Sequence, residues 1–213
     1  MFIPAKFRQT DFAEIRRFLA AHPLATLVVQ HDGRLQAAHI PLYWHDNGSE
    51  WGTLRGHFAK ANPIWQAAGA ENRWLAVFQD SGCYISPNWY PSKQRDHKAV
   101  PTWNYQAVHL EGRLTLIDDA DTVYAILAEL SRIHEAAQPR PWQLADAPQD
   151  YIQAMCKALK CFELTVDHVE AAYKLSQNQS AENRNGVLGG LAMQDGAAAA
   201  EMAQTIARFA PDS

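Results

Sequence analysis

Residues 24–44, LATLVVQHDGRLQAAHIPLYW, contain two apolar runs that flank a short polar segment. The first run is partly β-branched, and the sequence HDGR at residues 31–34 has the composition of a tight hairpin turn. The second run, residues 35–44, carries Pro41 inside a strand-like pattern. The stretch therefore predicts an antiparallel hairpin whose second strand lies at a sheet edge or a split, because proline cannot donate to a β-ladder.

More strand-like segments follow, separated by turn clusters, at residues 51–58, 73–79, 83–86, 108–117 and 162–167. The clearest is 108–117, in which valine and leucine alternate with polar residues. This alternation predicts a strand with one face against a core and the other toward solvent or a partner.

The helical signals are fewer than the strand signals. Asp11 is a good N-cap for a helix that ends before Pro23, and residues 119–136 have amphipathic spacing. A second amphipathic helix carries Ile152, Met155, Cys156 and Leu159 on one side. The tail, residues 180–211, predicts one or two helices of low amphipathicity. Together these patterns predict a single α+β domain over residues 1–213, an antiparallel β-barrel with flanking helices and a helical extension from about residue 180.

The composition is that of an ordinary globular protein, with 47% hydrophobic and 20% charged residues in 213. No apolar run approaches the length of a membrane span, and the first residues lack a signal-peptide pattern, so we expect a cytoplasmic protein. The net charge of −4 makes direct nucleic-acid binding doubtful. The three cysteines include no CxxC pair, which favours buried, reduced thiols. No histidine pair has metal-ligand spacing, so we expect no metal site.

The segment RGHFAKANP, residues 55–63, joins a strand to a helix. Asn62 is a suitable N-cap and Pro63 suits the first helical position, so free backbone N–H groups are expected around Ala59 to Asn62. Two fixed cations and one imidazole belong to the same segment: Arg55, Lys60 and His57. This pattern favours an anion site that suits a phosphate monoester. The alternative is a capped helix with ordinary surface cations.

The strand segment His39-Ile40-Pro41-Leu42 offers backbone groups that a neighbouring strand does not pair. Such groups can meet the alternating donors and acceptors of an isoalloxazine edge. The alternative is an edge strand that proline protects from aggregation.

Two later segments carry candidate ligand contacts. Trp103 lies in an aromatic segment that can stack on a ring, although a dimer interface is the favoured interpretation. Lys174, Ser176, Gln177 and Asn178 form a donor-rich cluster at a strand end, which is either a ligand clamp or a local loop knot.

These segments, in this order, resemble the PaiB family of FMN-binding negative transcriptional regulators. The matching pieces are residues 39–42, 56–63, 84–87, 89–90, 100–105, 174–178 and 190–191. Gln179 and Asn183 depart from the family pattern, which often has Arg and an acidic residue at these places.

The resemblance implies an FMN-binding split barrel that forms a homodimer and holds FMN near the subunit interface. It places the phosphate at residues 57–62 and the ring along residues 39–42. The candidate cofactor-binding residues are then His39, Ile40, Pro41, Leu42, Arg55, His57, Ala59, Lys60, Asn62, Trp103, Lys174, Ser176, Gln177 and Asn178.

The function implied is that of a flavin-dependent regulator, and we expect it to act indirectly because no helix-turn-helix pattern is present. A flavin-dependent oxidoreductase acting on a small molecule is the alternative, and a dimeric binding module without flavin is a third. No catalytic acid or base is predicted, since the flavin ring itself carries the electrons.

Overall fold

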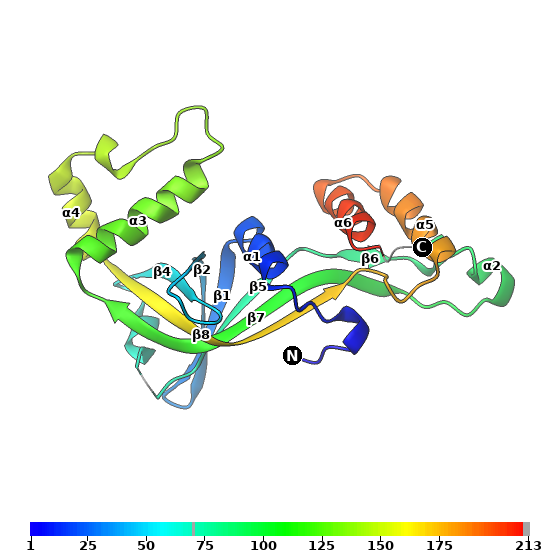
Figure 1. Ribbon diagram of the computed structural model, residues 1–213, viewed down its shortest axis with the longest axis horizontal. Helices are drawn as coiled ribbons and strands as arrows, with labels where there is room; N and C mark the ends of the chain where they lie inside the picture. The colour runs from blue at the N-terminus through cyan, green and yellow to red at the C-terminus, as the bar shows by residue number, and fades with distance from the viewer. Residues whose placement is uncertain (70, 211–213) are drawn as a thin grey trace. The chain divides into compact units, whose positions relative to one another are not determined.

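The computed structural model describes residues 1–69 and 71–210 (Figure 1). The chain divides into two compact units. The terminal unit comprises Met1–Ile15, Gln79–Val108 and Glu170–Ser213, and the central unit comprises Arg16–Phe78 and His109–Val169. The long strands β7 (Thr102–Ile117) and β8 (Leu159–Lys174) contribute residues to both units.

The central unit contains most of the strands. Its further elements are α1 (Phe12–Ala21, which begins in the terminal unit), β1 (Leu24–His31), β2 (Arg34–Pro41), β3 (Tyr43–His45), β4 (Thr53–Ala59), η2 (Pro63–Ala67), β5 (Trp74–Gln79), α3 (Ala120–Glu135), η4 (Leu144–Asp146) and α4 (Gln149–Lys157). The terminal unit adds η1 (Ala5–Phe7), β6 (Cys83–Ile85), η3 (Pro87–Trp89), α2 (Lys93–Asp96), α5 (Ala181–Ala192) and α6 (Ala197–Arg208). The strand order is β2-β1-β5-β7-β8-β4-β3, with β6 pairing β7. The predicted α+β split-barrel class is confirmed.

The predicted hairpin is β1 and β2, which pair antiparallel from Leu24↔Pro41 to His31↔Arg34. The turn places Asp32 at φ 50° and Gly33 at φ 72°. Positive φ at both central residues is the geometry of a type I′ turn, which matches the twist of the flanking strands. Turn chemistry and β-branched runs therefore determine this element locally.

The strands β2 and β3 lie at opposite ends of the strand order, yet only Leu42 separates them in the chain. The chain thus passes from one edge of the sheet to the other, as the closure of a split barrel requires. Leu42 is buried, its N–H donates to the Pro23 carbonyl over 2.9 Å, and it packs against Gly56 of β4. The prediction that Pro41 lies at an edge is confirmed.

The core of the central unit is aromatic where β4, β5 and β8 come together. Phe58 stacks on Phe162 with ring centroids 4.5 Å apart and lies 5.9 Å from the Trp74 ring. All three side chains are fully buried. A Cβ on Gly112 of β7 would lie 2.0 Å from the carbonyl oxygen of Thr165 on β8, so only glycine permits this approach of the two strands.

Helix α3 packs on the sheet through an apolar cluster. The cluster contains Ile126 and Leu130 from the helix with Tyr43 and Cys161 from the strands. Asp119 caps the helix by accepting from the Thr122 N–H over 2.9 Å. The amphipathic spacing predicted for residues 119–136 is confirmed, and its apolar side faces the sheet.

Some sequence-based boundaries were wrong, and so was the low amphipathicity predicted for the tail. Strand β7 begins at Thr102 rather than at 108, and β8 spans Leu159–Lys174 rather than 162–167, so Leu159 belongs to the strand and not to the preceding helix. The tail does form two helices, but α6 buries one clear face, against the prediction of low amphipathicity. That face consists of Ala199, Met202 and Ile206. The buried face of a short helix is hard to predict from its sequence, because most of its stability comes from packing in the folded unit.

Among the described residues, none of the helices combines the length and apolarity that a membrane span requires. No group of three or more potential metal ligands occurs in residues 1–69 and 71–210. All three cysteines are free thiols, with Cys83 and Cys161 buried and Cys156 half-buried.

Candidate functional site

The candidates Arg55 and His57 lie on the same face of β4, as predicted, and the β4–β8 register places Glu163 and Cys161 opposite them. The Arg55 Nε donates to Glu163 Oε1 over 2.6 Å, and Tyr43 forms a second hydrogen bond with this guanidinium. The charge of Arg55 is therefore matched within the central unit. Arg55 is therefore already engaged in an ion pair within the central unit.

His57 is largely enclosed on the same face of the sheet. Its buried Nδ1 has no hydrogen-bond partner in the described chain, and burial lowers the pKa of the imidazole. The ring is accordingly neutral at pH 7 and supplies no positive charge. Burial also raises the pKa of the Cys161 thiol to about 11, which keeps that neighbouring group protonated.

The turn after β4 has the predicted cap but not the predicted free amides. Asn62 Oδ1 accepts from the Ile64 N–H over 3.2 Å, and Pro63 begins η2. The N–H of Lys60 donates to the Ala158 carbonyl and that of Asn62 to the Ala59 carbonyl. The expectation of free backbone donors is wrong for these two amides, because strand pairing and a tight turn already use them.

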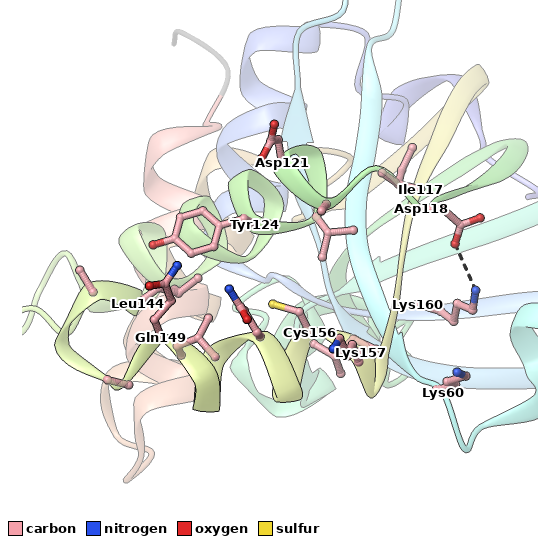
Figure 2. A pocket seen from close by; sticks show the side chains of 17 residues that line it. Lys60, Ile117, Asp118, Asp121, Tyr124, Leu144, Gln149, Cys156, Lys157 and Lys160 are labelled. Carbon is pink, nitrogen blue, oxygen red and sulfur yellow. Dashed lines mark hydrogen bonds and ion pairs between the residues drawn. The ribbon is translucent and has the colours of Figure 1, made fainter.

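The Lys60 side chain is exposed and lines a cavity of about 920 Å³ between α3 and α4 (Figure 2). Lys157 and Lys160 line the same cavity, because Ala59 pairs with Leu159 and the two strand ends coincide. Lys160 forms a 3.1 Å ion pair with Asp118, whereas Lys60 and Lys157 have no ion pair in the described structure. Sequence reasoning missed Lys157 and Lys160, whose signal is a basic pair at the junction of α4 and β8.

The edge segment has alternating exposure. Ile40 and Leu42 are buried, so they can offer a ligand only backbone atoms, whereas His39 is exposed and Pro41 half-buried. The His39 Nδ1 lies 3.0 Å from the Thr26 hydroxyl. Among the described strands, β2 has one neighbour in the strand order, β1, so no strand pairs with its other edge.

The remaining candidates belong to the terminal unit. Trp103 is 49% exposed and lies opposite Tyr84, with ring centroids 6.3 Å apart. Gln177 forms a local hydrogen-bonded loop, the loop knot of the sequence analysis. Its Oε1 accepts from the Leu175 N–H over 2.7 Å, and its Nε2 donates to the Tyr173 carbonyl. This knot is the alternative that the sequence left open for Gln177.

Lys174, Ser176 and Asn178 line a second, smaller cavity in the terminal unit, together with Asn104. The structure therefore brings the candidates together in two groups. The residues from His39 to Asn62 lie in the central unit, and Trp103 and residues 174–178 lie in the terminal unit.

Comparison with solved structures supports the class that this architecture defines. An FAD- and heme-binding protein from Mycobacterium smegmatis matches with a TM-score of 0.56 at 16% identity, covering 78% of this chain and 73% of that one. A conserved hypothetical protein from Mycobacterium tuberculosis matches with a TM-score of 0.56 at 11% identity, covering 92% and 98%. These similarities establish the fold, which is that of the split barrels.

Sequence comparison is more specific than the fold. Residues 1–168 match the family described as "Putative FMN-binding domain". Protease synthase and sporulation protein PAI 2 of Bacillus subtilis is 30% identical over 96% of this chain and 95% of its own length. An uncharacterized protein of Aspergillus fumigatus is 28% identical over 89% and 90%. The chain belongs to this FMN-binding family and, with PAI 2, to the PaiB group, and its cofactor is FMN.

Proposed function

We propose that the protein is a flavin-dependent regulator in which Lys60 and Lys157 hold the FMN phosphate. The observation that carries the proposal is that Lys60 and Lys157, which have no ion pair in the described structure, line one cavity. The β4–β8 register brings the two lysines to it. A phosphate dianion suits two cations that have no carboxylate partner. Asn62 shapes the turn that presents Lys60.

The open backbone edge of β2 suits the pyrimidine side of the flavin ring. This edge offers alternating N–H and carbonyl groups, with Pro41 interrupting the donors. His57 is neutral and therefore contributes no positive charge for binding a phosphate. In this proposal Lys60 and Lys157 provide the charge that selects the anionic cofactor. Bound FMN supplies the redox chemistry, and the protein positions it.

Regulation is proposed to be indirect. The relative PAI 2 is named for protease synthesis and sporulation, which supports a regulatory role. Residues 93–98 form a compact basic run that includes Lys93, Arg95 and Lys98. Its charge is partly neutralised, since both terminal nitrogens of Arg95 lie 2.7 Å from Glu182. Surface cations engaged in this way contribute little to the phosphate contacts that DNA binding requires.

The purified, FMN-loaded protein tests this function directly. We expect no sequence-specific DNA binding at physiological salt and slow flavin reduction by NADH or NADPH. In cells, replacing the wild type with Lys60→Ala should abolish the effect of the protein on protease production. Nanomolar operator binding would make the protein a direct repressor. Turnover of about 1 to 1,000 per second would make it an oxidoreductase instead.

We also propose a homodimer that uses the exposed aromatic pair of the terminal unit. Tyr84 and Trp103 are each about half exposed, and Val100 is 76% exposed. Exposed apolar side chains are typical of an interface, and Tyr84 and Trp103 lie side by side.

Sedimentation should give about twice the 23.9 kDa chain mass, and Trp103→Asp should shift the protein toward the monomer. Tyr151→Asp is the matched control, because Tyr151 is 56% exposed and lies in the other unit. A monomeric wild type, or dissociation by the control alone, would contradict the assignment.

A further inference from the structure

The smaller cavity, about 460 Å³, lies wholly within the terminal unit and is built for negative charge. Three lysines line it, Lys6, Lys98 and Lys174, and none of its lining residues is acidic. None of these lysines has an ion pair in the part of the chain that the structure describes. The remaining wall is largely amides and hydroxyls, so the cavity offers hydrogen bonds as well as charge.

A buried polar group in this cavity is unsatisfied. Asn104 is 1% exposed, and its Nδ2 donates to the Ser176 Oγ over 2.8 Å. Its Oδ1 is buried and has no hydrogen-bond partner in the described chain. A lone buried acceptor of this kind is unfavourable unless a ligand or water donates to it.

The residue that holds Asn104 adopts an unusual backbone conformation. Ser176 lies at φ 61°, in the left-handed region that non-glycine residues rarely adopt, and is almost fully buried. The Ser176 hydroxyl oxygen accepts the hydrogen bond from the Asn104 amide. Strain of this kind is concentrated at binding sites.

Lys174 differs from the two exposed lysines of the cavity. It is half-buried, its Nζ donates to the Thr102 hydroxyl, and burial lowers its pKa. Burial disfavours the charged form of a lysine that has no carboxylate nearby, and an anion that binds beside it stabilises that charged form.

We propose that this cavity binds a small organic anion, with a carboxylate or phosphate on the three lysines and an N–H or O–H group donating to Asn104 Oδ1. Its size suits a small metabolite. The site uses none of the residues proposed for the FMN phosphate. Lys174, Ser176 and Asn178 lie beyond residue 168, where the match to the FMN-binding domain ends, in a part of the chain that is still similar to PAI 2. The proposal therefore assigns these three residues to a second ligand rather than to FMN.

Calorimetry on the FMN-loaded protein at low salt, with inorganic phosphate and succinate as separate probes, tests the site and distinguishes the two head groups. We expect at least one probe to bind, and Lys174→Met to weaken it about tenfold or more. Lys93→Met is the matched control, since Lys93 has the same charge and lies in the same unit but does not line the cavity. Lys98→Met is a second variant at an exposed position, where a folding defect is not expected.

The FMN content of each variant, measured by visible absorption, separates this site from the cofactor site. Retained FMN with weakened probe binding supports the proposal, whether or not Lys60→Ala affects FMN. Loss of FMN in Lys174→Met would show that the cavity belongs to the cofactor and would overturn the proposal. Absence of binding by both probes, or equal binding in Lys174→Met and Lys93→Met, would overturn it as well.

Discussion

Lys60→Ala is expected to weaken FMN binding by about 1.5–3 kcal/mol, the range for a hydrogen bond to a charged group. The exposed position of Lys60 favours the lower end of this range, because solvent and salt screen the interaction. Riboflavin lacks the phosphate, so its affinity should change little. Fluorescence titration of the apoprotein with both flavins measures the difference.

Two further variants make this test specific. Lys157→Ala should also weaken FMN selectively, because Lys157 lines the same cavity without an ion pair. Arg55→Ala should reduce stability rather than FMN selectivity, because it leaves Glu163 without its partner. Equal losses of FMN and riboflavin affinity in Lys60→Ala would show that the lysine does not contact the phosphate.

Phe162→Ala should lower the free energy of unfolding by about 3–5 kcal/mol, a large part of the roughly 5–15 kcal/mol that stabilises a typical domain. Phe162 is fully buried, stacks on Phe58, and lies opposite Gly56 in the β4–β8 register. The truncation therefore opens a cavity where β4 joins β8. Urea unfolding should show a lower midpoint with an unchanged slope.

Phe162→Leu keeps most of the buried volume and should cost clearly less than the alanine variant. Tyr151→Ala, at an exposed position, should change stability by less than about 0.5 kcal/mol. A loss below about 1 kcal/mol in Phe162→Ala would mean that this aromatic core does not hold the two strands together.

Much of the fold could be predicted because its signals are local. Alternation in residues 108–117 and the turn at residues 31–34 each depend on neighbouring residues, and both predictions are confirmed. The cap by Asn62 is equally local, since the side chain and the amide that it binds are two residues apart. Strand ends were less predictable, because β7 and β8 continue as far as their neighbours can pair with them.

The sequence by itself determined the strand-rich class, the hairpin, the edge position of Pro41 and the family resemblance. The tertiary structure decided which charges remain available to a ligand. Glu163 is 108 residues from the Arg55 that it pairs with, and Ser176 is 72 residues from Asn104. Such partners are set by the register of strands distant in the chain, because a slip in pairing changes which side chains meet across the sheet.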